Sequence, residues 1–428
     1  MLLGVGVLVN YLDRVNLSVA RDALHTEFGL SNVAFGYMSS AYSWTYASLQ
    51  LPMGVLLDRF GVQIIGRISA LIWSIASFGA GMANGARSFL AMRLLLGVGE
   101  APTFPAYAKA TGYWFPRQER SLATAFFDSA AKFGTAIGVP GIGMLLLHFG
   151  WRWSFAATGL ASFLFFVAFY IVYRDPKDDG GLSAEEWRYI KEGGAHDGPE
   201  TARPKGASLG YLLRQRKVWG LGIGFAAYNY CFYLLLAWLP SYFSALHLDL
   251  AHSVIYTSVP WLFATATDLL VGGWLVDALI RRGYKETVVR QTILVGGTSL
   301  GLSIAGAMFT SKPMLATLWI TIALGGLSAA APVGWSIPSL IAPRDSVGRV
   351  GGILNFGNQL AAIVAPILTG YFAGPANSFS RAFAAAAAIL LVGIGGYILL
   401  LGKIEQLPEP GGISTEMKHR RSGHTNVD

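Results

Sequence analysis

The feature that most constrains this chain is a series of twelve apolar stretches, each long enough to cross a lipid bilayer as a helix. A membrane-spanning helix needs about 20 mostly apolar residues, and only helices or closed barrels satisfy their own backbone hydrogen bonds in lipid. The ten-residue alternation of membrane barrel strands is absent. The stretches cover residues 1–22, 33–57, 66–84, 88–112, 121–147, 152–173, 218–244, 252–276, 289–309, 314–341, 350–373 and 380–402. The sequence therefore predicts an all-α membrane protein with twelve transmembrane helices.

The composition agrees with a lipid environment. Only 13% of the residues are charged and 53% are hydrophobic, whereas a soluble domain carries about 25% charged residues. The single cysteine, Cys231, excludes an intrachain disulfide and a metal site built on cysteine pairs. The first stretch has no positively charged lead, and Asp13-Arg14 interrupts it. We therefore expect it to be a retained helix rather than a cleaved signal peptide.

One long polar segment, residues 174–217, divides the apolar stretches six and six. The predicted organisation is an N-terminal bundle at 1–173, a central loop at 174–217, a C-terminal bundle at 218–402 and a tail at 403–428. Within the loop, Ser183 followed by Glu186 is typical of a capping box. It predicts a short surface helix at 184–191.

Lysine and arginine gather in alternate loops. If the N-terminus is inside, the inner loops and tail hold nearly all of them, and the outer loops hold little beyond Arg21, Arg87, Arg152, Lys312 and Arg381. Cytoplasmic loops are enriched in these residues, so both termini are predicted to be cytoplasmic. The same asymmetry accounts for the net charge of +8, and nucleic acid is not an expected partner.

The two halves repeat one another. The second stretch ends with Gly54 followed four residues later by Asp58-Arg59, and the eighth ends with Gly273 followed four residues later by Asp277. Further echoes are Ala101-Pro102 with Ala331-Pro332, and Lys132 eight residues before Pro140 with Asn358 eight before Pro366. Internal repeats that hold a substrate between them at mid-membrane are a transporter plan. We expect two pseudo-symmetric six-helix bundles.

Several motifs resemble a known family. The Gly54-x-x-x-Asp58-Arg59-x-Gly61 loop resembles the major facilitator superfamily. The chain is more narrowly similar to its anion:cation symporter family, which includes galactonate, glucarate and hexuronate transporters. This similarity rests on Asn10–Arg14, Arg93–Pro102, Trp114–Arg120, Trp238–Pro240 and Asn355–Asn358. The resemblance implies alternating access, uptake of a small organic anion with protons, no cofactor, a functional monomer and a bacterial inner (plasma) membrane location.

Asp13 and Arg14 are the first charged residues inside a predicted span. A charge there costs about 2.5–3.5 kcal/mol on insertion scales, so each needs a partner or a role. Neighbouring helical residues point about 100° apart, so these two should meet groups from other helices. They form either structural ion pairs or a titrating carboxylate beside an anion-binding guanidinium. The resemblance implies the second, with Asp13 in proton coupling and Arg14 near the substrate.

Arg93 and Glu100 are seven residues apart in the fourth span, so they share one helix face about 10 Å apart. An arginine fork matches a carboxylate, and a low-dielectric site favours the protonated form of Glu100 unless a cation lies close. A static Arg93–Glu100 brace is the alternative. The resemblance implies that Arg93 binds the substrate and that Glu100 carries a proton.

Asp128 and Lys132 stand four residues apart in the fifth span and could neutralise one another. Sugar-acid transporters of the family usually have Asn-Ser-x-Gln here, and this chain has Ala131 at the glutamine position. Lys132 is therefore a candidate extra cationic contact, which would suit a more acidic or dicarboxylate ligand. Asp268 is either a second titrating group or the partner of a residue at the inner gate.

Polar and aromatic residues on other spans complete the candidate site. Tyr42, Tyr46 and Gln50 form a stripe that could serve packing or the pocket, and the amides Asn355 and Asn358 could be interhelical glue or ligand contacts. The predicted substrate-binding residues are Tyr11, Arg14, Tyr46, Arg93, Lys132, Trp335, Ser336 and Asn358. Asp58, Arg59 and Asp277 are predicted to stabilise a gating state without touching substrate.

Other functional classes lack their residues. Gly272-Gly273 has no strand–turn–helix context for phosphate, and His247 and His252 do not have metal spacing. No nucleophile set suggests an enzyme, and the loop and tail are small for a sensor's output domain. We expect a secondary transporter for proton-coupled uptake of a sugar acid: an aldonate, uronate or aldarate. An aromatic or dicarboxylic acid, sodium coupling and uniport remain as alternatives.

Overall fold

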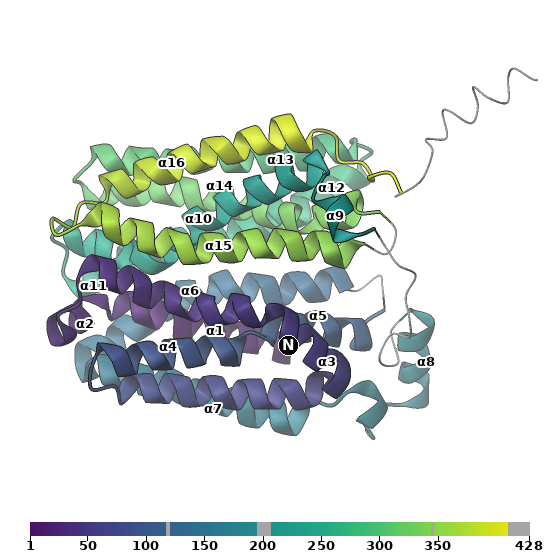
Figure 1. Cartoon of the computed structure of the whole chain (residues 1–428), viewed down its shortest axis with the longest axis horizontal. Coiled ribbons are helices and arrows are strands. Elements are labelled where there is room, and N and C mark those ends of the chain that lie inside the picture. Colours follow the sequence, from purple (N-terminus) through teal and green to yellow (C-terminus); the bar gives the residue numbers. More distant parts are fainter. Residues whose placement is uncertain (117–119, 195–206, 344–345, 410–428) are drawn as a thin grey trace, which may run out of the picture.

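The computed structural model describes residues 1–116, 120–194, 207–343 and 346–409, and it contains no strand in these ranges. Long helices run side by side in two stacked groups, with the first half of the chain below the second in Figure 1. Twelve helical segments reach from one end of the molecule to the other. Their bounds lie within a few residues of the predicted stretches. The predicted all-α membrane fold with twelve helices is confirmed.

The first half contains six of these segments. They are α1 (Leu2–Val19), the two arms of α3 (Asn32–Gly81), α4 (Ala86–Glu100) continued by α5 (Thr103–Trp114), α6 (Arg120–Phe149) and α7 (Trp151–Val172). The arms of α3 meet at Gly61, whose φ of 77° lies in the left-handed region. Glycine adopts that conformation without a steric penalty, so the chain can reverse there between two spans. Short α2 (Arg21–Phe28) joins α1 to α3.

The second half contains the other six. They are α10 (Arg216–Ala245), α11 (Leu250–Thr267) continued by η2 (Asp268–Leu275) and α12 (Val276–Arg281), α13 (Glu286–Gly301) continued by η3 (Leu302–Phe309), α14 (Pro313–Ile341), α15 (Val347–Ala373), and α16 (Ser380–Gly395) continued by η4 (Gly396–Leu401). The connection between the halves holds η1 (Pro176–Asp178), α8 (Ala184–Glu192) and α9 (Leu209–Leu212). Ser183 accepts a hydrogen bond from the Glu186 backbone N–H, 3.1 Å away, so the predicted N-cap and the short helix that follows it are confirmed.

Length and hydropathy alone mark ten helices of the described chain as able to cross a membrane. The first arm of α3 and the α4–α5 segment are not among them. The α4–α5 segment is divided at Ala101-Pro102 into two helices of 15 and 12 residues. The first arm of α3 carries a stripe of serine, tyrosine and glutamine. These two segments also carry residues of the candidate site, Tyr42 and Tyr46 in the first arm of α3 and Arg93 and Glu100 in α4.

The two ends of the molecule differ in how the halves meet. We call the end with α8 and α9 the loop end, and the end with α2 the far end (Figure 1). At the far end the helices approach closely: a Cβ on Gly36 would lie 2.5 Å from the Pro366 carbonyl oxygen, and one on Gly370 would lie 2.5 Å from that of Asn32. The first arm of α3 and α15 therefore touch backbone to backbone.

Polar contacts reinforce this far-end closure. Asn32 donates to the Gly374 carbonyl at 2.6 Å and to the Asn377 side chain at 2.8 Å, and Arg21 also reaches Asn377 at 3.2 Å. Ser244 donates to Asp22 at 2.7 Å. Toward the loop end, one described hydrogen bond joins the halves, from Asn355 to Gln50 at 3.5 Å. The described structure is closed at the far end.

Replacing Gly370 by alanine is expected to weaken this closure, because the added methyl group meets backbone that cannot rotate away. Spin labels on cysteines introduced at the exposed far-end positions Thr26 and Ala376 should show a shift toward longer distances. Gly352→Ala is the matched control in the same helix, since a Cβ there meets nothing within 4 Å. Identical distance distributions for the two variants would show that the Gly370 contact does not maintain the closed end.

Candidate functional site

The centre of the candidate site is an ion pair between α1 and α4. The Nε and Nη2 atoms of Arg14 donate to Oε2 of Glu100 at 2.9 and 2.6 Å, and both side chains are buried, with 4% and 0% of their surface exposed. In the apolar interior such a charge-assisted contact is short and strong. The structure thus pairs Glu100 with Arg14, and not with Arg93 of its own helix.

Tyrosines surround the guanidinium of Arg14. Its Cζ atom lies 4.7 Å from the ring centre of Tyr11, 4.9 Å from that of Tyr42 and 5.8 Å from that of Tyr46. Aromatic faces attract a cation at such distances. Three aromatic rings thus contact the guanidinium of Arg14 in addition to its carboxylate partner.

Asp13 faces another direction, as the 100° step between helical neighbours requires. Its Oδ2 atom accepts a hydrogen bond from the Ser162 hydroxyl of α7 at 2.8 Å, and Ser77 and Thr158 are also its neighbours. The carboxylate is buried inside the first half. Asp13 and Glu100 thus occupy separate surroundings, one lined by hydroxyls and the other by a cation.

Arg93 lies two helical turns from Glu100, toward the far end. Its guanidinium is 5.6 Å from the Tyr42 ring centre, and Nη1 is 3.5 Å from the Asp13 carbonyl oxygen. Tyr42 is consequently shared by Arg14 and Arg93. The two guanidinium groups flank one aromatic ring in the interior of the first half.

Several buried polar atoms near this centre have no hydrogen-bond partner in the described part of the chain. Among them are both amide atoms of Asn10, Oδ1 of Asp13, Nε of Arg93 and Oε1 of Glu100, and both amide atoms of the buried Asn358 of α15 also have none. Buried polar groups nearly always find a partner, so these atoms are available to a ligand. Asn10 was not singled out by sequence reasoning. Its spacing of four residues from Arg14, on the same face of α1, is the signal that could have found it.

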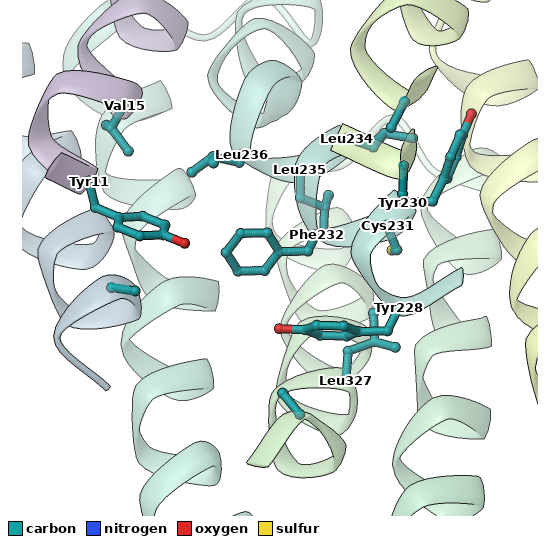
Figure 2. Packing of buried hydrophobic residues seen from close by; sticks show 14 of the residues in the cluster. Tyr11, Val15, Tyr228, Tyr230, Cys231, Phe232, Leu234, Leu235, Leu236 and Leu327 are labelled. Atoms are coloured by element: carbon teal, nitrogen blue, oxygen red, sulfur yellow. The ribbon is translucent and has the colours of Figure 1, made fainter. Parts of the chain in front are cut away.

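The second half contributes aromatic residues of α10. The Tyr42 hydroxyl donates to that of Tyr233 at 3.5 Å. The rings of Tyr11 and Phe232 meet edge to face, with their centres 6.5 Å apart, and Figure 2 shows these two side chains facing one another across the boundary between the halves. Tyr233 was also missed from the sequence, where it lies within an aromatic run in an apolar helix.

A second buried ion pair joins the halves directly. The Nζ atom of Lys132 in α6 lies 2.9 Å from Oδ2 of Asp268 at the start of η2, and their side chains are 5% and 3% exposed. The sequence left the partner of each residue open. The structure pairs them near the middle of their spans, away from the loop end. The side chain of Asp128, the other acid considered for Lys132, lies outside the described residues.

Other predicted site residues lie elsewhere. Ser336 of α14 accepts a hydrogen bond from Arg290 of α13 at 2.6 Å, and Trp335 packs edge to face on Phe225 at 5.1 Å. These described contacts of Ser336 and Trp335 are with residues of the second half, and their role at the substrate stays a prediction. Arg59 and Asp277 are exposed near the loop end, and the side chain of Asp58 lies outside the described residues.

The described residues hold no group of three or more histidine, cysteine, aspartate or glutamate side chains that could bind a metal ion. What they do hold is a set of buried cations and acids between helices. Arg14, Glu100, Arg93 and Asp13 come from α1 and α4, and Lys132 and Asp268 come from opposite halves. This arrangement can bind an anion and exchange protons.

Comparison with known proteins agrees with this chemistry. The model of the Major Facilitator Superfamily matches residues 3–288. The uncharacterized transporter YybO of Bacillus subtilis (strain 168) is 40% identical, with 94% of this chain and 93% of that protein covered. The D-galactonate transporter of Escherichia coli O6:H1 is 32% identical (94% and 95% covered), and the probable galactarate/D-glucarate transporter GarP of Escherichia coli (strain K12) is 33% identical (93% of each).

Solved structures show the same fold. A bacterial homolog of the human lysosomal transporter Spinster, in an inward-facing and occupied conformation, has a TM-score of 0.75 at 16% identity and covers 93% of this chain and 95% of that one. A D-xylose–proton symporter has a TM-score of 0.72 at 17% identity, with 95% and 98% covered. The family model and the curated relatives identify a transporter and not an enzyme. The chain belongs to the major facilitator superfamily, and its sugar-acid transporter relatives confirm the resemblance to the anion:cation symporters.

Proposed function

We propose that this transporter takes up a small organic anion together with protons, and that the anion is a sugar acid. The observation that carries the proposal is the buried Arg14–Glu100 pair inside its ring of tyrosines. Arginine is the side chain best suited to hold a carboxylate at two points. In this structure the guanidinium of Arg14 already donates to the carboxylate of Glu100.

The pair implies an exchange. A substrate carboxylate that binds Arg14 must displace the carboxylate of Glu100, which would then be a buried charge without compensation. Taking up a proton removes that cost. Anion binding at Arg14 and protonation of Glu100 therefore favour each other, and this positive coupling is what a proton gradient needs in order to drive a substrate uphill.

Asp13 is the proposed second proton carrier. It lies next to Arg14 in sequence, but hydroxyls surround it, and Ser162 donates to it at 2.8 Å. Hydroxyl groups can donate to a carboxylate or accept from a carboxyl group, so this environment accommodates both protonation states. Asp13 can therefore gain or lose a proton while Arg14 keeps its contacts.

The remaining groups fit a polyhydroxy acid. Asn10 and Asn358 offer amide atoms without partners in the described structure, and the rings of Tyr11 and Tyr46, each of which carries a phenol hydroxyl, lie beside the cation. Each sugar hydroxyl both donates and accepts, which matches amide and phenol groups. The D-galactonate and galactarate/D-glucarate transporters among the relatives support this substrate class.

The closed far end completes the proposal. If both termini are cytoplasmic, as the positive-inside distribution indicates, the far end faces outward and the structure is an inward-facing state. The anion and protons would leave toward the loop end, on whose side Asn355 and Gln50 make the single hydrogen bond between the halves that the structure describes there. Uptake would then require the far-end contacts of Asn32 and Gly370 to separate.

Transport by the purified protein in proteoliposomes tests the proposal. Galactonate and galactarate should accumulate when the outside is made acidic, and a protonophore should abolish the accumulation. One pH unit supplies about 1.4 kcal/mol per proton, so the substrate should be concentrated up to about tenfold for each coupled proton. Accumulation driven by sodium instead would overturn the proton coupling. Failure to bind or carry any sugar acid would overturn the substrate class.

A further inference from the structure

We propose that Lys132 and Asp268 form a second anion-exchange site, at which the distal acidic group of a doubly charged substrate replaces Asp268 on Lys132 and so releases a bond between the two halves. The proposal rests on the proposed function and specifies its substrate as a dianion. Arg14 would hold one acidic group and Lys132 the other. The evidence concerns depth, connectivity and the form of helix η2.

Lys132 lies nearer the loop end than Arg14. A Cβ on Gly134 would meet the Leu8 backbone and one on Gly138 would meet the Leu12 side chain, so Lys132 is level with Gly6 of α1. Arg14 is eight residues farther along α1, or about 12 Å farther from the loop end. The two ion pairs are therefore at different depths, and a dianion that binds both cations would lie along the spans.

Aromatic side chains connect the two pairs. Tyr11, which stacks on Arg14, meets Phe232 of the second half at 6.5 Å, and Phe232 meets Trp261 of α11 at 5.2 Å. Trp261 lies seven residues, or two turns, before Asp268 on the same helical segment. Aromatic contacts therefore lead from the Arg14 pair to the helical segment that carries Asp268.

The two pairs differ in what they hold together. Arg14 and Glu100 both belong to the first half, whereas Lys132–Asp268 is, across the described ranges, the one buried ion pair that joins the halves. Removing one member of a buried pair leaves the other as an uncompensated charge. A ligand carboxylate that takes the place of Asp268 keeps Lys132 neutralised, but the charge of Lys132 no longer binds α6 to the second half.

Asp268 is also placed where the helix can adjust. It begins η2, a π-helical segment that interrupts the α-helix from Thr267 to Val276. Such segments have wider turns and recur at functional sites. A regular α-helix would hold the carboxylate in one register, and the π-helical turns give it room to move away from Lys132.

Galactarate and galactonate provide a matched test, because they share a carbon skeleton and differ in one terminal group, a carboxylate or a hydroxymethyl. Their dissociation constants are measured by calorimetry on the purified full chain at one pH. We expect wild type to prefer galactarate, and Lys132→Gln to reduce that preference at least tenfold. Asp268→Asn, which removes the competing carboxylate, should strengthen galactarate binding.

The controls separate exchange from a static brace. If Lys132→Gln does not fold because Asp268 is left unpaired, the double variant Lys132→Gln/Asp268→Asn removes both charges and must also lose the preference for galactarate. An unchanged preference, or equal weakening of both acids by Asp268→Asn, would overturn the inference. Wild type that binds galactonate but does not prefer galactarate would overturn it too and leave the proposed function intact. Wild type that binds neither acid would overturn both.

Discussion

Glu100→Gln is expected to abolish the accumulation of substrate against its gradient while preserving exchange of substrate across the membrane. Glutamine has the shape of the protonated acid but cannot gain or lose a proton. It also removes the carboxylate that competes for Arg14, 2.6 Å away. The anion should therefore bind at least as tightly as in wild type. Its affinity should no longer change with protonation at position 100, because glutamine does not titrate.

Two assays in proteoliposomes distinguish these effects. Under an imposed gradient of one pH unit, wild type should concentrate its substrate up to about tenfold for each coupled proton, and Glu100→Gln should reach only equal concentrations inside and outside. Counterflow, in which internal unlabelled substrate exchanges for external labelled substrate, should continue. The expected result is a loss of coupling and not of transport.

Glu405→Gln is the matched control for Glu100→Gln. Glu405 also pairs with a cation, Lys217, at 3.0 Å, but its side chain is 65% exposed at the loop end. An exposed pair contributes little, and accumulation by this variant should equal that of wild type. If Glu100→Gln still concentrates substrate against its gradient, Glu100 is not the coupling group, and the exchange at Arg14 is wrong as a mechanism.

The second large effect is expected at Arg14. Arg14→Lys keeps the charge but removes the guanidinium that bonds Glu100 through two nitrogens and lies against Tyr11 and Tyr42. A lysine ammonium cannot reproduce both contacts. Loss of a buried, hydrogen-bonded charge contact costs about 2–5 kcal/mol, so substrate binding should weaken by at least about 30-fold. Equilibrium binding of a radiolabelled sugar acid measures this.

Arg152 provides a control with the same kinds of contact. Its guanidinium pairs with Glu27 at 2.6 Å and lies 4.3 Å from the Trp151 ring centre, but the side chain is 43% exposed at the far end. Arg152→Lys should change binding by less than about twofold. Similar losses in the two variants would mean that Arg14 acts through the stability of the bundle. Arg14→Gln/Glu100→Gln, which leaves no unpaired charge, should fold and still fail to bind.

The positions of the spans could be predicted because each helix must be apolar over the thickness of the bilayer, whatever its neighbours are. The predicted stretch 121–147 corresponds to α6 at Arg120–Phe149, and 314–341 corresponds to α14 at Pro313–Ile341. The buried charges Asp13, Arg14, Arg93 and Glu100 were identified for the same reason, since the cost of a charge in lipid is a local property.

The partners of these charges depended on how the helices rotate and pack. Arg93 and Glu100 share a helix face, which made a brace between them reasonable, yet the geometry pairs Glu100 with Arg14 of another helix. Ser336 was predicted to contact substrate, and packing gives it a hydrogen bond from Arg290 that the sequence did not indicate. Asn10 and Tyr233, whose residue types are common in packed spans, became candidates only through their neighbours.

Lys132 shows most clearly which features follow from the sequence and which depend on tertiary packing. The sequence presented a lysine in an apolar helix with an acid one turn away, and a second acid, Asp268, far along the chain. Apolar patterning and spacing were sufficient for the class of protein, the twelve helices and the presence of buried charge, because these follow from the solvent and from helical geometry. Only tertiary packing could place Lys132 2.9 Å from Asp268 across the two halves, because an ion pair between distant helices depends on their relative rotation and depth, which spacing along one helix does not encode.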